Sequence, residues 1–327
     1  MAENFSEQLD QALAVLLANP DARPVVTADV ESLLDVAREL RGLPRDEFKS
    51  RLRGQLLRSV SMSDEGTATA KSVNYIREGF HTITPYIAVH DVMGLIEFVK
   101  QAFDAEGAVY GIGSQGGYHS EYKIGDSFVM IGGGGAWKGE QKLTALHLYV
   151  DDVDASYARA LAAGAKAINE PIEAHGERVA GVQDLAGNEW YLAKRLSGSH
   201  TNEGLRSVNV YLHPVGAAKM IDFLKLSFGA EEIISHRETP DGPVLHAKIR
   251  IGDSVLEMGE AHGPYQALPS MLFLYVDDVD AWHQRAVAGG ATVIDEPKDQ
   301  PYGDRVSAVS DPFGNTWYLA THIANPV

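Results

Sequence analysis

Residues 146–171 read LHLYVDDVDASYARALAAGAKAINEP, and residues 272–297 repeat this segment as LFLYVDDVDAWHQRAVAGGATVIDEP. After one inserted residue the match resumes, with GERVAGVQDLAGNEWYLAKR answering GDRVSAVSDPFGNTWYLATH. Upstream, TPYIAVHDVMGLIEFVKQAF matches NVYLHPVGAAKMIDFLKLSF, and YHSEYKIGDS matches LHAKIRIGDS. Self-similarity at a fixed spacing indicates one structural unit used again. Residues 80–196 and 205–323 are therefore predicted to be two copies of one domain.

Each copy passes twice through the same order of hydrophobic patterns. The alternating segment ITPYIAV predicts a strand, the spacing of Ile96, Val99 and Phe103 predicts a helix, and YHSEYKIGDSFVMIGG predicts two strands around a turn. The order then restarts at LHLYV, where the pair Asp151 and Asp152 is expected to cap a helix. Each copy is thus a strand–helix–strand–strand–strand unit, βαβββ, used twice.

The first part of the chain carries helical periodicity and little strand signal. Apolar stripes predict three short helices, of which the third begins at Pro44 because proline suits a first helical turn. Residues 1–60 are predicted to form a small all-α domain. Residues 61–79 lose this period and are rich in Ser, Thr and Gly, so they are interpreted as a linker.

The composition excludes several classes of protein. The chain has no cysteine, which excludes disulfides, thiolate metal sites and a cysteine nucleophile. The 28 Lys and Arg residues are outnumbered by 45 Asp and Glu residues, and the formal net charge of −17 disfavours nucleic acid and anionic membranes as partners. The sequence has no apolar run of membrane-spanning length and no signal-peptide pattern, so we expect a cytoplasmic protein.

The paired units and the phrases YVDDVDA, GDRV and DPFGNTWYLATH resemble the vicinal-oxygen-chelate superfamily of glyoxalase I, bleomycin-resistance proteins and extradiol dioxygenases. HTITPYIAV, YKIGDS and DPFGN are most similar to its PhnB-like branch, and the resemblance covers residues 80–323. It implies an α+β fold of two tandem glyoxalase-like domains, each a paired βαβββ open half-barrel with a concave ligand-binding face, behind the all-α domain. The two copies are expected to pack as a pseudo-dimer within one chain, and a homodimer is left open. Members of the family also build half-barrels from modules of different copies or chains, so the pairing of modules stays open too.

Metal-using members of the superfamily place one ligand on the first, fourth, fifth and last strand of a half-barrel. Copy one has at these positions Thr84, Met130, Ala145 and Tyr191, and copy two has Asn209, Glu257, Met271 and Tyr318. Only Glu257 is a good ligand for a divalent ion, whereas a stable site needs at least three donors. The resemblance therefore implies that the metal site has been lost, and no cofactor is expected.

Strand alternation selects the side chains that share the concave face with these positions. The candidate ligand-binding residues are Tyr86, His119, His147, Tyr149, Tyr191, Tyr211, His213, His246, Glu257 and Tyr318. His119 and His246 stand at matching positions before IGDS, and their structural alternative is a hydrogen-bonded strand residue near the rim. Glu257 must meet a polar partner, reach water or contact a cationic or hydrogen-bonding ligand, because an unpaired carboxylate is costly to bury.

Three functions remain open, and no catalytic residue is assigned. The first is a binding protein that takes up a small aromatic or cationic molecule without a metal. The second is a metal-dependent lyase or dioxygenase, with donors among His119, Glu121 and His147, or among His213, His246 and Glu257. The third is a ligand-sensing regulator that contacts a partner protein through the helical domain.

Overall fold

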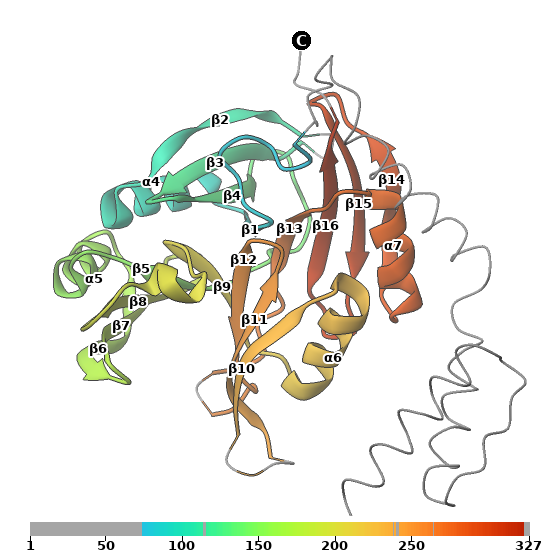
Figure 1. Ribbon diagram of the computed structural model, residues 1–327. Coiled ribbons are helices and arrows are strands. Elements are labelled where there is room, and N and C mark those ends of the chain that lie inside the picture. Colours follow the sequence, from blue (N-terminus) through green and yellow to red (C-terminus); the bar gives the residue numbers. More distant parts are fainter. Residues whose placement is uncertain (1–73, 114–115, 238, 240–241, 264, 324–327) are drawn as a thin grey trace, which may run out of the picture. The chain divides into compact units, whose positions relative to one another are not determined.

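The computed structural model describes residues 74–323 apart from 114–115, 238, 240–241 and 264, and Figure 1 shows its helices and strands. These residues belong to a unit that spans Ser72–Val327. The predicted all-α domain of residues 1–60 and the linker as far as residue 73 lie outside the described residues. None of the described helices has the length and apolar character needed to cross a bilayer.

Each copy follows the βαβββ order twice, as its sequence pattern predicts. Copy one contains β1 Ile83–Val89, α4 Val92–Phe103, β2 Glu106–Ile112, β3 Tyr118–Ile124, β4 Ser127–Gly133, β5 Ala145–Tyr149, α5 Val153–Ala162, β6 Lys166–Ala174, β7 Glu177–Gln183 and β8 Glu189–Arg195. Copy two contains β9 Val208–Leu212, α6 Ala217–Phe228, β10 Glu231–Arg237, β11 Val244–Ile251, β12 Ser254–Met258, β13 Met271–Tyr275, α7 Val279–Ala288, β14 Thr292–Asp299, β15 Asp304–Ser310 and β16 Thr316–His322. A short 3-10 helix, η1 His200–Glu203, precedes β9.

The strands form two eight-stranded sheets, and each sheet combines halves of both copies. Sheet A has the order β14-β15-β16-β13-β1-β4-β3-β2, and sheet B has the order β10-β11-β12-β9-β5-β8-β7-β6. The fold class of two tandem glyoxalase-like units is therefore confirmed. The expectation that each copy supplies all eight strands of its own half-barrel is wrong, because β1 pairs antiparallel with β13 and β5 pairs antiparallel with β9.

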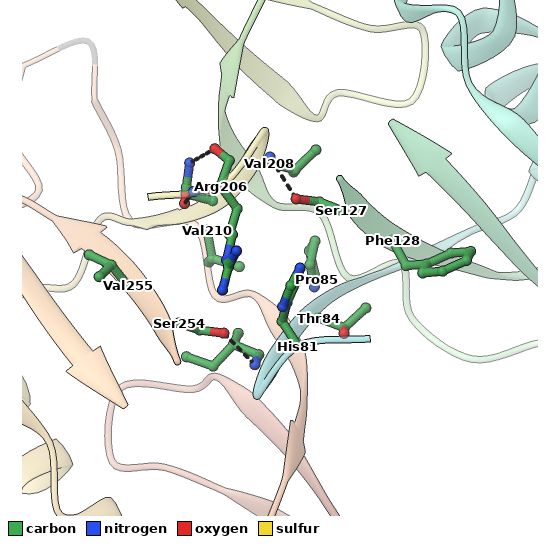
Figure 2. A pocket seen from close by; sticks show the side chains of 12 residues that line it. His81, Thr84, Pro85, Ser127, Phe128, Arg206, Val208, Val210, Ser254 and Val255 are labelled. Atoms are coloured by element: carbon green, nitrogen blue, oxygen red, sulfur yellow. Dashed lines mark hydrogen bonds between the residues drawn. The ribbon is translucent and has the colours of Figure 1, made fainter. Parts of the chain in front are cut away.

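The repeated Gly-Asp-Ser turns give a physical reason for this exchange. Asp126 accepts a hydrogen bond of 2.8 Å from the backbone N–H of Ser207, at the start of β9. In the same way Asp253 accepts one of 2.8 Å from Thr82, at the start of β1. Figure 2 shows this junction, where a void of about 10 Å³ leaves room for about one water molecule. Each turn thus holds the opening strand of the other copy.

The helices, unlike the strands, pack within their own copy. Phe103 of α4 lies 4.8 Å from the ring of the fully buried Trp190 in β8, and Phe228 of α6 lies 4.8 Å from that of Trp317 in β16. Both indoles face the helices, as alternation predicts. Each copy therefore contributes one helix–helix contact to a continuous core, while its two strand sets belong to different sheets.

Two repeated motifs have structural functions at turns. Asp152 accepts from the N–H of Ala155 and so caps α5, which confirms the predicted capping role of the Asp-Asp pair. In the turn between β15 and β16, Asp311 accepts from two backbone N–H groups and from the indole of Trp317. The phrase DPFGNTW is therefore a hydrogen-bonded turn.

Candidate functional site

We call the face of each sheet that is turned away from the helices its inner face. In β5, Leu146 and Leu148 belong to the core beneath the helices, so His147 and Tyr149 lie on the inner face of sheet B. The neighbouring strands continue this face, because His147 is in register with Tyr191 of β8 and Glu257 of β12 is in register with Tyr211 of β9. Sheet B thus collects side chains from both copies.

A histidine and a glutamate from different copies form the centre of this face. His147 Nδ1 bonds directly to Glu257 Oε2, and the Glu257 side chain is 1% exposed. The bond passes over β9, where the Asn209 amide is turned back and bonds the main chain of Arg206. Ala145, which lies opposite Tyr211, presents only a methyl group. These short side chains leave room for the two longer ones to meet.

The pair is expected to be charged on both sides. Burial raises the pKa of Glu257, but the charge of His147 and its hydrogen bond outweigh burial and hold the pKa below its usual value. Burial lowers the pKa of His147, and the carboxylate of Glu257 outweighs it, so the pKa is raised. Both shifts favour the imidazolium–carboxylate form of the pair.

Further charged groups surround this pair in matched partnerships. Lys248 Nζ bonds Glu203 and lies 3.9 Å from Glu257 Oε1. Arg195 bridges Glu203 and Glu177, with 2.9 Å between its Nε and Glu177 Oε1. Glu177, Glu203 and Glu257 are therefore already paired with cations of the chain itself.

Aromatic rings line the same face beyond the charged pair. Tyr191 and Tyr211 meet edge to face with centroids 5.6 Å apart, and Tyr265 stacks on His213 with centroids 5.6 Å apart. The Tyr191 hydroxyl donates to Glu189 and lies 3.1 Å from His213 Nε2, which fits a donated bond from a neutral imidazole. Burial lowers the pKa of His213 to about 4, so this ring is neutral at pH 7.

The inner face of sheet A is closed by an apolar cluster. Phe80, Met130, Phe273 and Tyr275 are buried together, and Phe80 stacks on Phe128 with centroids 4.5 Å apart. The segment that carries Phe80 precedes β1 and includes described residues of the predicted linker. Arg77 from this segment bonds Glu121 of β3. Sheet A therefore presents packed side chains where sheet B presents the charged pair.

The residues at the family's metal positions do not fit a metal ion. Sorted by sheet, the positions are Thr84, Met130, Met271 and Tyr318 in sheet A, and Asn209, Glu257, Ala145 and Tyr191 in sheet B. In sheet B the Asn209 amide is hydrogen-bonded to the backbone of Arg206, and the Tyr191 hydroxyl donates to Glu189. Within the described residues, no group of three His, Asp or Glu side chains is arranged to hold an ion.

A hollow of about 280 Å³ lies on the helix side, beside the start of α4. Its polar groups have structural functions, because Asp91 caps α4 and Gln141 accepts from the N–H of His90. Asp184 in its wall accepts from the indole of Trp190. The inner face of sheet B is the better candidate site.

The structure divides the ten candidate residues between the two sheets. Those of sheet A are Tyr86, His119 and Tyr318; those of sheet B are His147, Tyr149, Tyr191, Tyr211, His246 and Glu257, together with His213, which directly follows β9. His119 lies 3.2 Å from Glu121 and 3.3 Å from the Tyr86 hydroxyl, while His246 Nε2 lies 3.6 Å from Glu257. Of the two donor sets considered for a metal, the first is thus divided, since His119 and His147 belong to different sheets, whereas His213, His246 and Glu257 of the second lie together at sheet B.

Sequence reasoning missed the cations of sheet B. Lys248 lies two residues after His246, and Arg195 lies four after Tyr191, so strand alternation places both on the inner face. His200, whose ring stacks on Tyr149 at 4.4 Å, belongs to η1, and Tyr265 belongs to a loop. No periodic pattern identifies those two residues.

Comparisons with known proteins agree with this fold. Residues 215–319 match the model of the Glyoxalase/Bleomycin resistance protein/Dioxygenase superfamily. The uncharacterized protein Rv0887c of Mycobacterium tuberculosis is 36% identical over 143 residues, which are 38% of this chain and 84% of that protein. The uncharacterized protein Mb0911c of Mycobacterium bovis is 40% identical over 114 residues, which are 32% of this chain and 74% of that protein.

Two solved structures extend the likeness over both copies. The crystal structure of glyoxalase I from Zea mays has a TM-score of 0.56 at 16% identity and covers 73% of this chain and 92% of that one. A putative dioxygenase from Bacillus subtilis has a TM-score of 0.52 at 14% identity and covers 74% of this chain and 85% of that one. At such identities the likeness concerns the fold alone. The chain belongs to the glyoxalase/bleomycin resistance protein/dioxygenase superfamily.

Proposed function

We propose that this protein binds a small aromatic molecule on the inner face of sheet B, without a metal ion. The observation that carries the proposal is the contrast between the sheets. Sheet B brings Tyr191, Tyr211 and His213 beside the His147–Glu257 pair, whereas sheet A fills the equivalent space with an apolar cluster. One chain would therefore hold one ligand.

An aromatic ligand suits this face better than a cationic one. Rings of Tyr and neutral His offer faces and edges to a flat guest, and such contacts contribute about 0.5–1.5 kcal/mol each. A cation would need a free carboxylate, but Glu257 already bonds His147, and Glu203 bonds Lys248 and Arg195. The charges of Glu257 and Glu203 are thus balanced by neighbouring cations.

The test compares two matched tyrosine variants. Tyr211 on sheet B and Tyr86 on sheet A occupy equivalent positions in the repeat and each lies 3.3 Å from a histidine. With a panel of small aromatic fragments screened by ligand-observed NMR, Tyr211→Leu should weaken binding about tenfold, the equivalent of one good ring contact. Tyr86→Leu should leave binding unchanged. The proposal would be excluded if both variants bound the fragments as tightly as the wild type, or if no fragment of the panel bound.

The second candidate function is a metal-dependent lyase or dioxygenase. One observation favours it, namely that two imidazoles approach the Glu257 carboxylate: His147 bonds it and His246 Nε2 lies 3.6 Å away. Elemental analysis decides between the two functions. About one zinc, nickel, iron or manganese ion per chain, lost in Glu257→Gln, would favour the enzyme; no stoichiometric metal would favour binding. A regulatory role rests on residues 1–60, which lie outside the described residues.

A further inference from the structure

The His147 imidazole directs one nitrogen into the protein and leaves the other free. Nδ1 is bonded to Glu257, and no described residue bonds Nε2. The side chain is 12% exposed, so it is held by the sheet and still reached from outside. An imidazolium oriented by a buried carboxylate through one nitrogen can donate a hydrogen bond at the other.

The groups that face this histidine come from six neighbouring elements. They are Glu257 of β12, His246 and Lys248 of β11, Tyr191 of β8, Glu177 of β7, Tyr211 of β9 and His200 of η1, with Tyr149 on its own strand. Each carboxylate among them has a cationic or hydroxyl partner of its own, as Glu177 has in Arg195 and Tyr149. The free hydrogen-bonding position offered to a ligand is therefore His147 Nε2.

We propose that the ligand is an aromatic molecule with an acidic ring hydroxyl, and that it is bound as its oxyanion on His147 Nε2. This inference rests on the proposed function and specifies its ligand. On binding, the O–H bond of the ligand breaks, its proton passes to solvent water, and the oxygen accepts a hydrogen bond from the Nε2–H that the imidazolium already carries. The electron pair stays on the oxygen, and the imidazolium keeps its Nδ1–H bond to Glu257.

The surroundings favour the ligand in its oxyanion form. The oxyanion lies next to a cation that the Glu257 carboxylate stabilises from behind, and a hydrogen bond between charged partners is about twice as strong as a neutral one. The ring that carries the oxyanion can contact Tyr149, whose centroid lies 4.7 Å from that of His147. A molecule without the hydroxyl would keep the ring contacts and lose this bond.

The repeat provides a built-in comparison. In sheet A the position of His147 is taken by Phe273, and that of Glu257 by Met130, both buried in the apolar cluster. Sheet A therefore has no equivalent hydrogen-bond donor at this place. A substitution of Phe273 provides a matched control that leaves the site of sheet B intact.

The experiment uses 4-nitrophenol as the probe, because its phenol and phenolate forms differ in absorption spectrum. At a pH where the free probe is mostly protonated, the full-length protein should shift the bound probe to the phenolate spectrum. His147→Gln, which can still bond Glu257, should abolish the shift and weaken binding at least tenfold. Glu257→Gln should reduce the shift, and Phe273→Leu should not change it.

The methyl ether 4-nitroanisole separates the two proposals. If the ether and the phenol bind equally and His147→Gln affects neither, aromatic binding stands and oxyanion binding is overturned. If neither probe binds, the proposed function fails and this inference with it. Circular dichroism of each variant establishes that a lost signal does not come from unfolding.

Discussion

His147 and Glu257 lie where sheet A has Phe273 and Met130. Equivalent positions of the repeat are therefore filled by a polar pair in sheet B and by an apolar pair in sheet A. Burying an ion pair is often no more favourable than burying apolar side chains of similar volume. Removing one partner is different, since it leaves the other charge uncompensated. The polar pair is therefore better explained by a function on this face than by a gain in stability.

The first prediction follows from this asymmetry. His147→Phe alone should lower the free energy of unfolding by about 3 kcal/mol, because Glu257 is left buried without its main partner. The double variant His147→Phe with Glu257→Met copies the sheet A pair and should recover most of that loss. Urea unfolding of the wild type, both single variants and the double variant measures the coupling. If the losses of the two single variants add up in the double variant, the coupling between His147 and Glu257 is contradicted.

His213 gives a prediction on pH. Its pKa is about 4 in the folded protein, against about 6.5 in an unfolded chain, because burial disfavours the imidazolium. As pH falls below about 6.5 the unfolded state therefore binds a proton first, and stability falls by up to about 3 kcal/mol near pH 4.

The variant His213→Gln should lack this loss while keeping a donor for the Tyr191 hydroxyl. His147 acts with the opposite sign, because its raised pKa supplies stability below about 6.5 that is lost as pH rises through the folded value. The quantity to measure is thus the difference in unfolding free energy between wild type and His213→Gln from pH 7 to pH 4. If this difference stays constant from pH 7 to pH 4, the lowered pKa of His213 is contradicted.

At the scale of single elements, the turn before β16 is held by one aspartate. Asp311 accepts from the N–H groups of Phe313 and Asn315, from the Asn315 amide and from the indole of Trp317. It is buried, with burial raising the pKa above its usual value despite these bonds. The turn, the register of β15 with β16 and the position of Trp317 therefore depend on one side chain.

The third prediction is that Asp311→Ala destabilises the protein by at least about 3 kcal/mol. Several donors, including a buried indole N–H, lose their acceptor together, and each unpaired buried group costs about 1–3 kcal/mol. Asp299→Ala is the control, because Asp299 is exposed and its side chain pairs with Arg305 at the surface, so a much smaller loss is expected. Guanidinium unfolding followed by tryptophan fluorescence compares the two.

The helices and strands, and the face on which each side chain lies, could be predicted from the sequence because they depend on local patterns. Alternation in LHLYV correctly places His147 and Tyr149 together, and the Asp-Asp pair correctly predicts a helix cap at Asp152. The bond between His147 and Glu257 could not be predicted from the sequence. Their side chains are 110 residues apart and meet only because β5 and β12 flank β9.

At the scale of the whole molecule, the exchange of strands between copies could not be derived from the repeat. LHLYV of β5 and LFLYV of β13 are nearly the same, so either could pair with β1 by its hydrophobic pattern. The structure pairs β1 with β13, and the Gly-Asp-Ser turn before β12 fixes this choice by binding the first residues of β1. The ligand site depends on the outcome, because only this pairing puts His147 and Glu257 in one sheet.

The last prediction tests the exchange through cross-links, which the absence of native cysteine makes specific. Ile83 of β1 is in register with Leu274 of β13, and antiparallel partners have Cα atoms about 4.5–5.5 Å apart, within reach of a disulfide. Ile83→Cys with Leu274→Cys should therefore form an intramolecular disulfide under mild oxidation. Leu148 is the residue that corresponds to Leu274 in copy one, so Ile83→Cys with Leu148→Cys would cross-link only if copy one closed its own sheet. Peptide mass spectrometry of both oxidised variants should find the first disulfide and not the second, since β5 pairs with β9 and β8. The reverse result would mean that each half-barrel is built from one copy. His147 and Glu257 would then belong to different sheets.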